Sequence, residues 1–122
     1  MACSPSSSEG CAAIKANYGT SINSWCFDYS INDMSGLFKD TDFNEPIGSW
    51  DVSRIQNMQG MFKNAEFDQD ISTWTVSQVT NMNSMFRDAR EFDKNIGQWD
   101  VSSVIDMSFM FFGASKFNKG IS

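Results

Sequence analysis

The sequence of 122 residues contains no histidine, and this absence bears directly on function. Histidine is the commonest general acid or base in enzymes and the commonest protein ligand of transition metals. Carboxylates remain the only available acid–base pair, and a glycosidase-like pair would need a cleft that a regular repeat does not imply. We therefore expect a protein that is not an enzyme and that holds no metal and no cofactor.

Long apolar runs are also missing, and positive charge is scarce. No segment approaches the roughly 20 apolar residues that a membrane-spanning helix needs, so we expect no membrane span. The 9 lysines and arginines are outnumbered by 15 acidic residues, which gives a net charge of −6. Because sequence-independent binding to nucleic acids depends on neutralising phosphates with Lys and Arg, we expect no nucleic-acid partner.

Cysteine is rare and is confined to the first quarter of the chain, at Cys3, Cys11 and Cys26. The spacing matches no zinc motif, and no histidine can complete one. Two states stay open: three free thiols, or one disulfide with one thiol left over, for which Cys11 and Cys26 are the favoured pair. The opening "MACSPSSSEG" lacks the basic and apolar regions of a signal peptide, so we expect no intact one in this chain.

What the chain has in abundance is one recurring phrase. It appears as "DMSGLF", "NMQGMF", "NMNSMF" and "DMSFMF" at residues 33–38, 57–62, 81–86 and 106–111. The first methionines of these phrases, Met34, Met58, Met82 and Met107, follow one another at steps of 24, 24 and 25 residues. Ile or Val, Phe and Trp recur at the same steps, and the extra residue of the longer unit falls between Ala89 and Phe92. Such a period indicates coils that bury their apolar edges by stacking.

The phrase itself predicts a short helix. Asn57 is followed by apolar residues at Met58, Met61, Phe62 and Ala65, the spacing of one apolar helical stripe. An Asp or Asn before each methionine can accept a backbone N–H of the first turn, as helix N-caps do. Cations come near the end of the first three predicted helices, where they suit the helix dipole: Lys39, Lys63 and Arg87.

The second half of each unit predicts a short strand. In "IGSWDVS" at 47–53, Trp50 and Val52 alternate with Asp51, as in a strand with one buried face. The prediction is therefore an α/β repeat: a short solenoid of 24–25-residue coils, each with a short strand and a short helix, similar to leucine-rich repeats. We expect an N-terminal cap at 1–17 and a solenoid of about four repeats at 18–122, the last incomplete.

The repeated pattern Trp-Asp-Val-Ser-x-Val-x-Asx-Met-x-x-Met-Phe, at 50–62, 74–86 and 99–111 with Thr75 in place of Asp and Ile55 in place of Val, resembles a known family. This is the BspA-like surface-protein repeat, also called domain of unknown function 285. The resemblance implies kinship with leucine-rich repeats and a non-catalytic role in adhesion or recognition. It also implies an extracellular or cell-surface location, and it carries no binding residues to transfer.

Outward positions of the predicted strands form a candidate binding face: Ser49, Asp51, Thr73, Thr75, Gln98 and Asp100. Parallel strands would space these columns by about 4.8 Å, and repeat proteins commonly bind partners on such faces. We expect a protein partner there, with a glycan as an alternative; a solvated face without a ligand stays open. The many methionines indicate core packing rather than a metal site, and the Asx column Asn44, Asp68, Asp93 and Asn118 indicates a structural ladder.

The chain stops at "FNKGIS", before the Trp and Val that would complete its unit. An uncapped repeat would leave an apolar layer and a backbone edge open to association. The candidate assembly end consists of Met107, Met110, Phe111, Phe117 and Ile121. The alternative function is therefore a structural subunit that assembles, with itself or another protein, through its open ends, and the chain could also be a fragment of a longer array.

Overall fold

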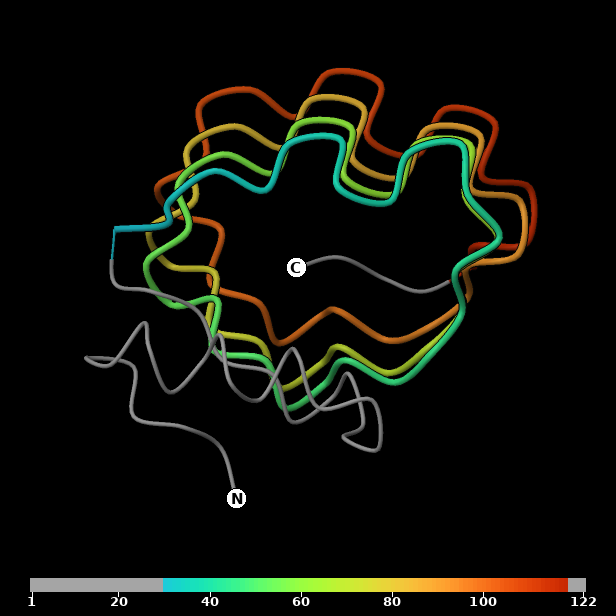
Figure 1. Cartoon of the computed structure of the whole chain (residues 1–122). Helices are drawn as coiled ribbons and strands as arrows, with labels where there is room; N and C mark the ends of the chain where they lie inside the picture. The colour runs from blue at the N-terminus through green and yellow to red at the C-terminus, as the bar shows by residue number, and fades with distance from the viewer. Residues whose placement is uncertain (1–29, 119–122) are drawn as a thin grey trace.

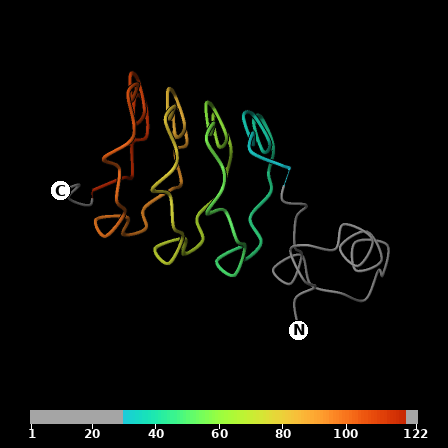
Figure 2. The same ribbon diagram turned by 90° about the vertical axis from the view of Figure 1, so that its left-hand side faces the viewer.

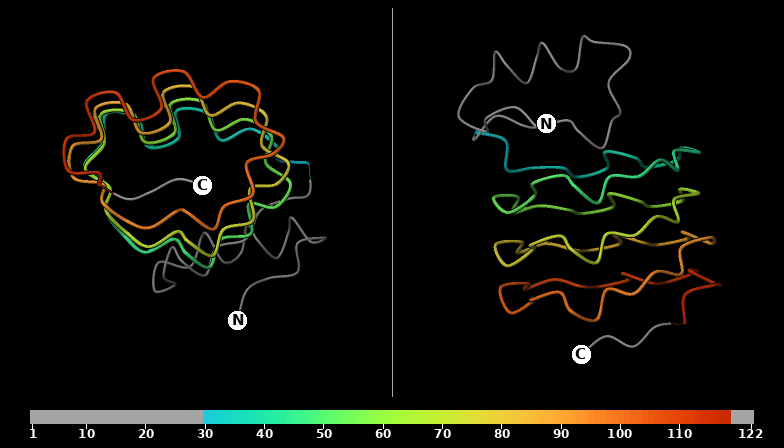
Figure 3. Two further views of the ribbon diagram at one scale, coloured as in Figure 1. Left: turned by 180° about the vertical axis from the view of Figure 1, so that it is seen from behind. Right: turned by 90° about the horizontal axis from the view of Figure 1, so that it is seen from below.

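The computed structural model describes residues 30–118, whose trace winds into a stack of coils (Figure 1). Seen from the side, the coils follow one another along a single direction (Figure 2). The view from below shows the same order (Figure 3, right). We number the coils by the sequence repeat, as coil one at 31–54, coil two at 55–78, coil three at 79–103 and coil four from 104 onward.

Within residues 30–118 there is no helix, and the only strand-like pairing consists of three isolated parallel bridges. The bridges join Asp33 to Asn57, Asn57 to Asn81, and Asn81 to Asp106. The prediction of an α/β solenoid with a short strand and a short helix in each coil, on a leucine-rich-repeat plan, is therefore wrong. Each coil consists instead of tight turns joined by extended segments.

In coil two, a run of tight turns replaces the predicted helix. The N–H of Met61 donates to the carbonyl of Met58 at 3.2 Å, and the same type of bond recurs four residues later. The third residues of these two turns are Gly60 and Asn64, with φ of 60° and 55°. Type II turns require a positive φ at this position, whereas a right-handed helix requires a negative φ throughout. These two residues therefore exclude a helix here.

The same two left-handed positions recur in every coil, always four residues apart. They are Gly36 and Asp40, Gly60 and Asn64, Ser84 and Asp88, and Phe109 and Gly113. The resulting turns appear as repeated square bends along the upper edge of the stack (Figure 1). Because the turns point Met58, Met61 and Phe62 inward, all three fully buried, the apolar spacing that suggested a helix is satisfied without one.

Alternate backbone N–H groups of each turn run bind the next coil. In coil one the donors Met34, Gly36, Phe38 and Asp40 reach the carbonyls of Asn57, Gln59, Met61 and Lys63, each at 2.9 Å. Equivalent sets of four bonds join coil two to coil three and coil three to coil four. The intervening N–H groups of Leu37 and Lys39 donate within their own coil. No N–H of this run is thus left without a partner, as buried backbone requires.

The Asx residue that opens each run accepts the N–H two residues later. In coil two the Oδ1 of Asn57 accepts the N–H of Gln59 at 2.9 Å, and the other three coils repeat the bond. This is the hydrogen bond that a helix N-cap would accept, but it opens an Asx turn. The Asx side chain thus accepts a backbone N–H as predicted, but a run of turns follows it and not a helix.

Within residues 30–118 the predicted strand segments keep their predicted alternation but do not pair. Trp50 and Val52 are buried, with exposed fractions of 4% and 1%, while Asp51 is exposed. Turns flank the segment on both sides, because the N–H of Trp50 donates to Ile47 and that of Ile55 donates to Val52. These turns break the extended run before a backbone ladder can form.

Stacked aromatic rings fill the core. Phe62 lies between Phe38 and Phe86, with ring centroids 5.6 and 5.4 Å away. A second phenylalanine column runs beside the first, and Phe62 and Phe67 of one coil stack at 4.3 Å. Offset stacks of this kind add to the burial of apolar area. The inner rings are fully buried, whereas Phe111 of coil four is only partly covered.

One further sequence prediction is confirmed at the edge of the coils. In the Asx column, Asn44 accepts the N–H of Asp68 at 2.7 Å, and the next two coil pairs repeat the bond. The extra residue of coil three lies in an exposed turn, where Arg90 and Glu91 separate two buried residues. The predicted cap at 1–17, the three cysteines and Ile121 lie outside the described residues.

We expect Trp74→Ala to lower the free energy of unfolding by about 3–5 kcal/mol, the usual cost of truncating a buried aromatic residue. Trp74 stacks on Trp99 at 6.4 Å, and its indole N–H donates to the carbonyl of Ile47 at 3.0 Å. Denaturant titration measures the change, with the exposed neighbour Thr75→Ala as a control that should stay within about 0.5 kcal/mol of wild type. An unchanged midpoint for Trp74→Ala would contradict its place in the core.

We expect Gly60→Ala to destabilise the protein by about 1–2 kcal/mol, the cost of a left-handed conformation for a residue with a Cβ. A Cβ at Gly60 has room, because its nearest neighbour is the Cβ of Lys63 at 3.8 Å, so the backbone conformation alone sets the cost. In a helix the same change would stabilise by up to about 1 kcal/mol. A higher midpoint for Gly60→Ala in denaturant titration would therefore favour a helix at this position and contradict the turn run.

Candidate functional site

The structure leaves all six residues of the predicted binding face exposed: Ser49, Asp51, Thr73, Thr75, Gln98 and Asp100. Several of their polar groups already serve the coil itself. Oδ1 of Asp51 accepts both the N–H and the hydroxyl of Ser53, and the hydroxyl of Thr73 donates to the carbonyl of Gly48. None of the hollows described below includes these residues. That they bind a partner stays a prediction.

Hydrogen bonds within a turn lower the pKa of two carboxylates of this face. The Ser53 hydroxyl, with smaller contributions from its N–H and from Arg54, lowers the pKa of Asp51. The Ser102 hydroxyl and N–H lower the pKa of Asp100 in the same way. Both carboxylates therefore stay ionised below the usual range for Asp.

The residues of the predicted assembly end differ in exposure. Met107 is 37% exposed, Phe111 and Phe117 are half-buried, and Met110 is buried at 5%. The same coil carries exposed apolar residues that the sequence analysis did not single out: Ile105, Phe109 and Phe112. Coils one and two hold polar or small residues at these three positions, so the fourth coil departs from the repeat on its outer surface.

A groove of about 400 Å³ crosses the turn runs of coils one to three. Each coil contributes one cation to it, and these are Lys39, Lys63 and Arg87. Small left-handed residues, Gly36, Gly60 and Ser84, lie between the cations and hydroxyl or amide side chains. Among the described residues that line the groove there is no carboxylate, although the chain carries a net charge of −6. We call this feature the cationic groove.

At its coil-four end, the cationic groove meets two phenylalanines. The guanidinium carbon of Arg87 lies 5.2 Å from the ring centroids of both Phe109 and Phe112, within cation–π range. The rings meet edge to face at 6.0 Å and are 56% and 58% exposed. Phe109 has a φ of 59°, although a bulky residue rarely adopts this conformation. Arg87 is thus held in place by a pair of rings, one of them on a strained backbone.

From the sequence, the three cations are predicted to complete a helix dipole. Without a helix that explanation fails, and the turn run brings the cations side by side in one groove. The signal was present in the sequence as a column at the 24-residue step. What was missing was the path of the backbone, which decides where the residues of the column point.

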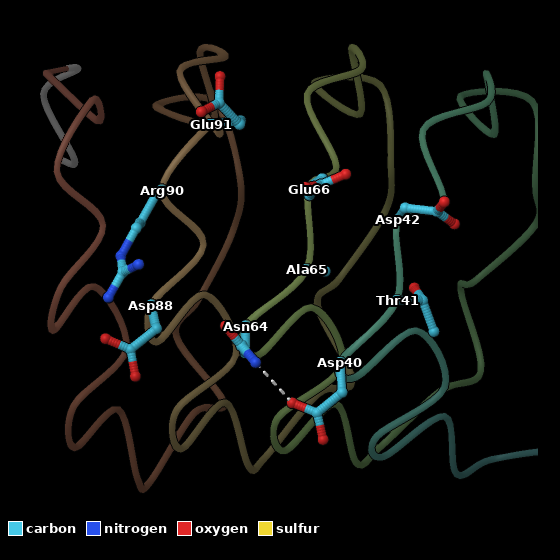
Figure 4. Close-up of a pocket in the computed structure, with 9 residues that line it drawn as sticks. All are labelled: Asp40, Thr41, Asp42, Asn64, Ala65, Glu66, Asp88, Arg90 and Glu91. Atoms are coloured by element: carbon cyan, nitrogen blue, oxygen red, sulfur yellow. Dashed lines mark hydrogen bonds between the residues drawn. The ribbon is translucent and has the colours of Figure 1, made fainter.

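A second hollow, of about 690 Å³, is lined by several acidic residues together with one cation, Arg90. Its acidic members include one residue per coil, Asp42, Glu66 and Glu91, which we call the acidic column. Figure 4 shows these carboxylates in a row, with Asn64 donating to Asp40 at 2.9 Å beside them. Lys116 continues the row in coil four, and its hydrogen bond to Glu91 at 2.7 Å raises the pKa of Lys116.

Within residues 30–118 no group of three or more Cys, Asp or Glu side chains is placed to hold a metal ion. The same part of the chain contains no helix with the length and apolar character that a membrane span requires. The charged residues that the structure does bring together form two rows of opposite charge, and the same coils build both rows.

Comparison with known proteins gives one match. The family model described as "Mycoplasma protein of unknown function, DUF285" matches residues 8–122. No curated protein and no solved structure matches the chain. The match covers all the repeats whose pattern resembled this family, and the chain therefore belongs to the DUF285 family.

Proposed function

We propose that the chain is a non-catalytic recognition module that binds an anionic partner, a protein or a glycan, in the cationic groove. The observation that carries the proposal is the column of three cations on an acidic chain, with no carboxylate among the described residues that line its groove. We further propose that the module works at a cell surface or outside the cell, as the resemblance of its repeat implies.

The cations of the groove are available to a partner. Lys39 and Lys63 take part in none of the ion pairs formed within residues 30–118. Arg87 has one such contact, from its Nε to Asp88, and at 3.9 Å this contact is long for a charged pair. Like charges stacked at the spacing of neighbouring coils repel one another, so the column costs stability when it is empty. An anion would remove this cost.

The groove is a better candidate than the predicted binding face. Asp51, Thr73 and Asp100 on that face already exchange hydrogen bonds with their own or a neighbouring coil. In the groove, the rings that flank Arg87 limit its rotamers before binding, which lowers the entropy that a partner must overcome. Concave shape, one sign of charge and a pre-positioned guanidinium occur together there.

Binding of fluorescently labelled poly-L-glutamate and polygalacturonate, followed by anisotropy, tests the proposal. We expect at least one of the two polymers to bind, and the triple variant Lys39→Gln, Lys63→Gln and Arg87→Gln to bind it at least about tenfold more weakly. The estimate follows from about 1 kcal/mol for each ion contact at 4 Å in water.

The matched control removes three cations outside the groove: Arg54→Gln, Lys94→Gln and Lys116→Gln. Both triple variants carry the same net charge, so the control should bind within about twofold of wild type if the groove is the site. Equal losses in the two variants would show that net charge alone matters and would contradict the proposal. So would a wild-type chain that binds neither polymer at low salt.

A second candidate function, a structural subunit that associates with another copy, rests on coil four. The N–H groups of Met107, Phe109, Phe111 and Gly113 are the counterparts of those that bind the next coil elsewhere, and they make no backbone bond within residues 30–118. Exposed apolar side chains surround this edge, Ile105 at 87% and Phe112 at 58%. Unpaired edges and apolar patches favour association.

The double variant Phe109→Gly and Phe112→Lys tests this candidate, because it installs the residues that coils one and two use at the same positions. If coil four makes the contact, the wild type should associate at high concentration in sedimentation velocity even at about 1 M salt, where charged contacts are screened, and the variant should remain monomeric there. Since the replacements suit the turn geometry, the variant should unfold no earlier than wild type. Identical sedimentation of the two chains would contradict a role for this surface in assembly.

A further inference from the structure

The cationic groove and the acidic column belong to the same coils and lie close together on the chain. In coil one Lys39 lies in the groove and Asp42 in the column, and in coil two Lys63 and Glu66 keep the same separation. Coil three adds one residue between its two members because of the inserted Arg90. The molecule therefore presents a positive and a negative row that run in the same direction along the stack.

The two rows match in step and in length. Both advance by one coil at a time, and the backbone bonds that join coils fix this step at about 4.8 Å. Both occupy coils one to three and both change chemistry in coil four, where Phe112 replaces the cation and Lys116 replaces the acid. A ligand whose charges repeat at the spacing of the groove is thus present on the chain itself.

An extended acidic peptide fits this spacing less well. Its side chains on one face recur every second residue, about 6.6–6.8 Å apart. Over three cations the mismatch accumulates to several ångströms, so an extended peptide can follow the row only by bending. The acidic column of another copy has the same spacing as the cations, so one acid can face one cation at every coil.

The members of the two rows are available for pairing. Asp42 and Glu66 are exposed and take part in none of the ion pairs within the described residues, as holds for Lys39 and Lys63. Glu91 binds Lys116, but both side chains are at least half exposed, so this bond is readily exchanged for another.

From these observations we propose that the cationic groove receives the acidic column of a second copy of this chain, side by side and in register. The inference rests on the proposed function, because it names the anionic partner of that groove. A two-fold axis parallel to the stack would set coil against coil and pair each row with its opposite twice, which is the usual closed form of a self-complementary contact.

Coil four supports the same register. With coil facing coil, Lys116 of one copy meets the ring of Phe112 of the other, and both side chains are well exposed. An ammonium over an aromatic face is an attractive pair. The change of chemistry at the end of both rows therefore preserves their complementarity.

The net charge of −6 on each copy makes two copies repel each other at long range. The salt concentration decides whether this repulsion or the attraction between the rows is stronger. At about 0.15 M salt the screening length is about 8 Å, so charges far from the interface are largely screened while ion contacts at 4 Å or less persist. At about 1 M the screening length falls to about 3 Å, and the contacts weaken as well. Association should therefore be present near 0.15 M salt and lost at 1 M.

A charge exchange between the rows tests the inference on the full chain. The groove variant carries Lys39→Glu, Lys63→Glu and Arg87→Glu, and the column variant carries Asp42→Lys, Glu66→Lys and Glu91→Lys. Sedimentation of wild type at 0.15 M salt should show weak, concentration-dependent association through the charged rows. Each variant alone should sediment as a monomer, because its two rows carry the same sign.

An equimolar mixture of the two variants should associate at least as strongly as wild type, since every reversed pair then meets its opposite. Recovery in the mixture also shows that both variants fold. Association of wild type that survives 1 M salt, or a mixture that stays monomeric, would overturn the inference. If the wild type remains a monomer and yet binds poly-L-glutamate through the groove, the inference fails while the proposed function stands.

Discussion

Alternate donation of backbone N–H groups is the interaction on which the stack depends. Along the turn runs of coils one to three, one N–H reaches the next coil and the following one closes a turn within its own coil. The left-handed residues four positions apart make this possible, because they reverse the direction of the chain twice in a few residues. This set of bonds fixes the spacing of the aromatic columns, of the Asx ladder and of the charged rows.

This arrangement separates the inside of a coil from its outside. Inward positions are restricted to residues that stack on their own counterparts, as the rings of Phe62 and Phe86 do at 5.4 Å. Outward positions face no such restriction, so a column of like residues there is not required by packing. A row of cations on an acidic chain therefore calls for an explanation outside the core, and so does the change to Phe109 and Phe112 in coil four.

The period of the repeat, the family and the core residues could be predicted from the sequence, because each depends on side-chain pattern. The buried Trp50 and Val52 and the bonding of Asn44 to the next coil follow from the same pattern. The backbone path could not be predicted from apolar spacing, since a turn run buries Met58, Met61 and Phe62 as a helix does. Gly60 and Asn64 held the missing information, because they are residue types that tolerate a positive φ and disfavour a helix interior.

The candidate site was missed for the same reason. Lys63 was visible as part of a column, but its neighbours in space follow from the turn geometry. Because a turn run takes the place of the predicted helix, the three cations line a groove and do not complete a helix dipole. The acidic residues that follow them in the chain line a separate hollow. The wrong prediction of a helix thus led to a wrong interpretation of the three cations.

The identical bonding at each coil boundary also bears on how genes for such chains can change. Coil two gives coil three the same four backbone bonds that it receives from coil one. Unequal recombination that removes or duplicates the segment encoding one inner coil would leave every remaining boundary chemically complete. Copy number can therefore vary in a lineage without a new fold, while each added unit lengthens the charged rows on its surface by one step.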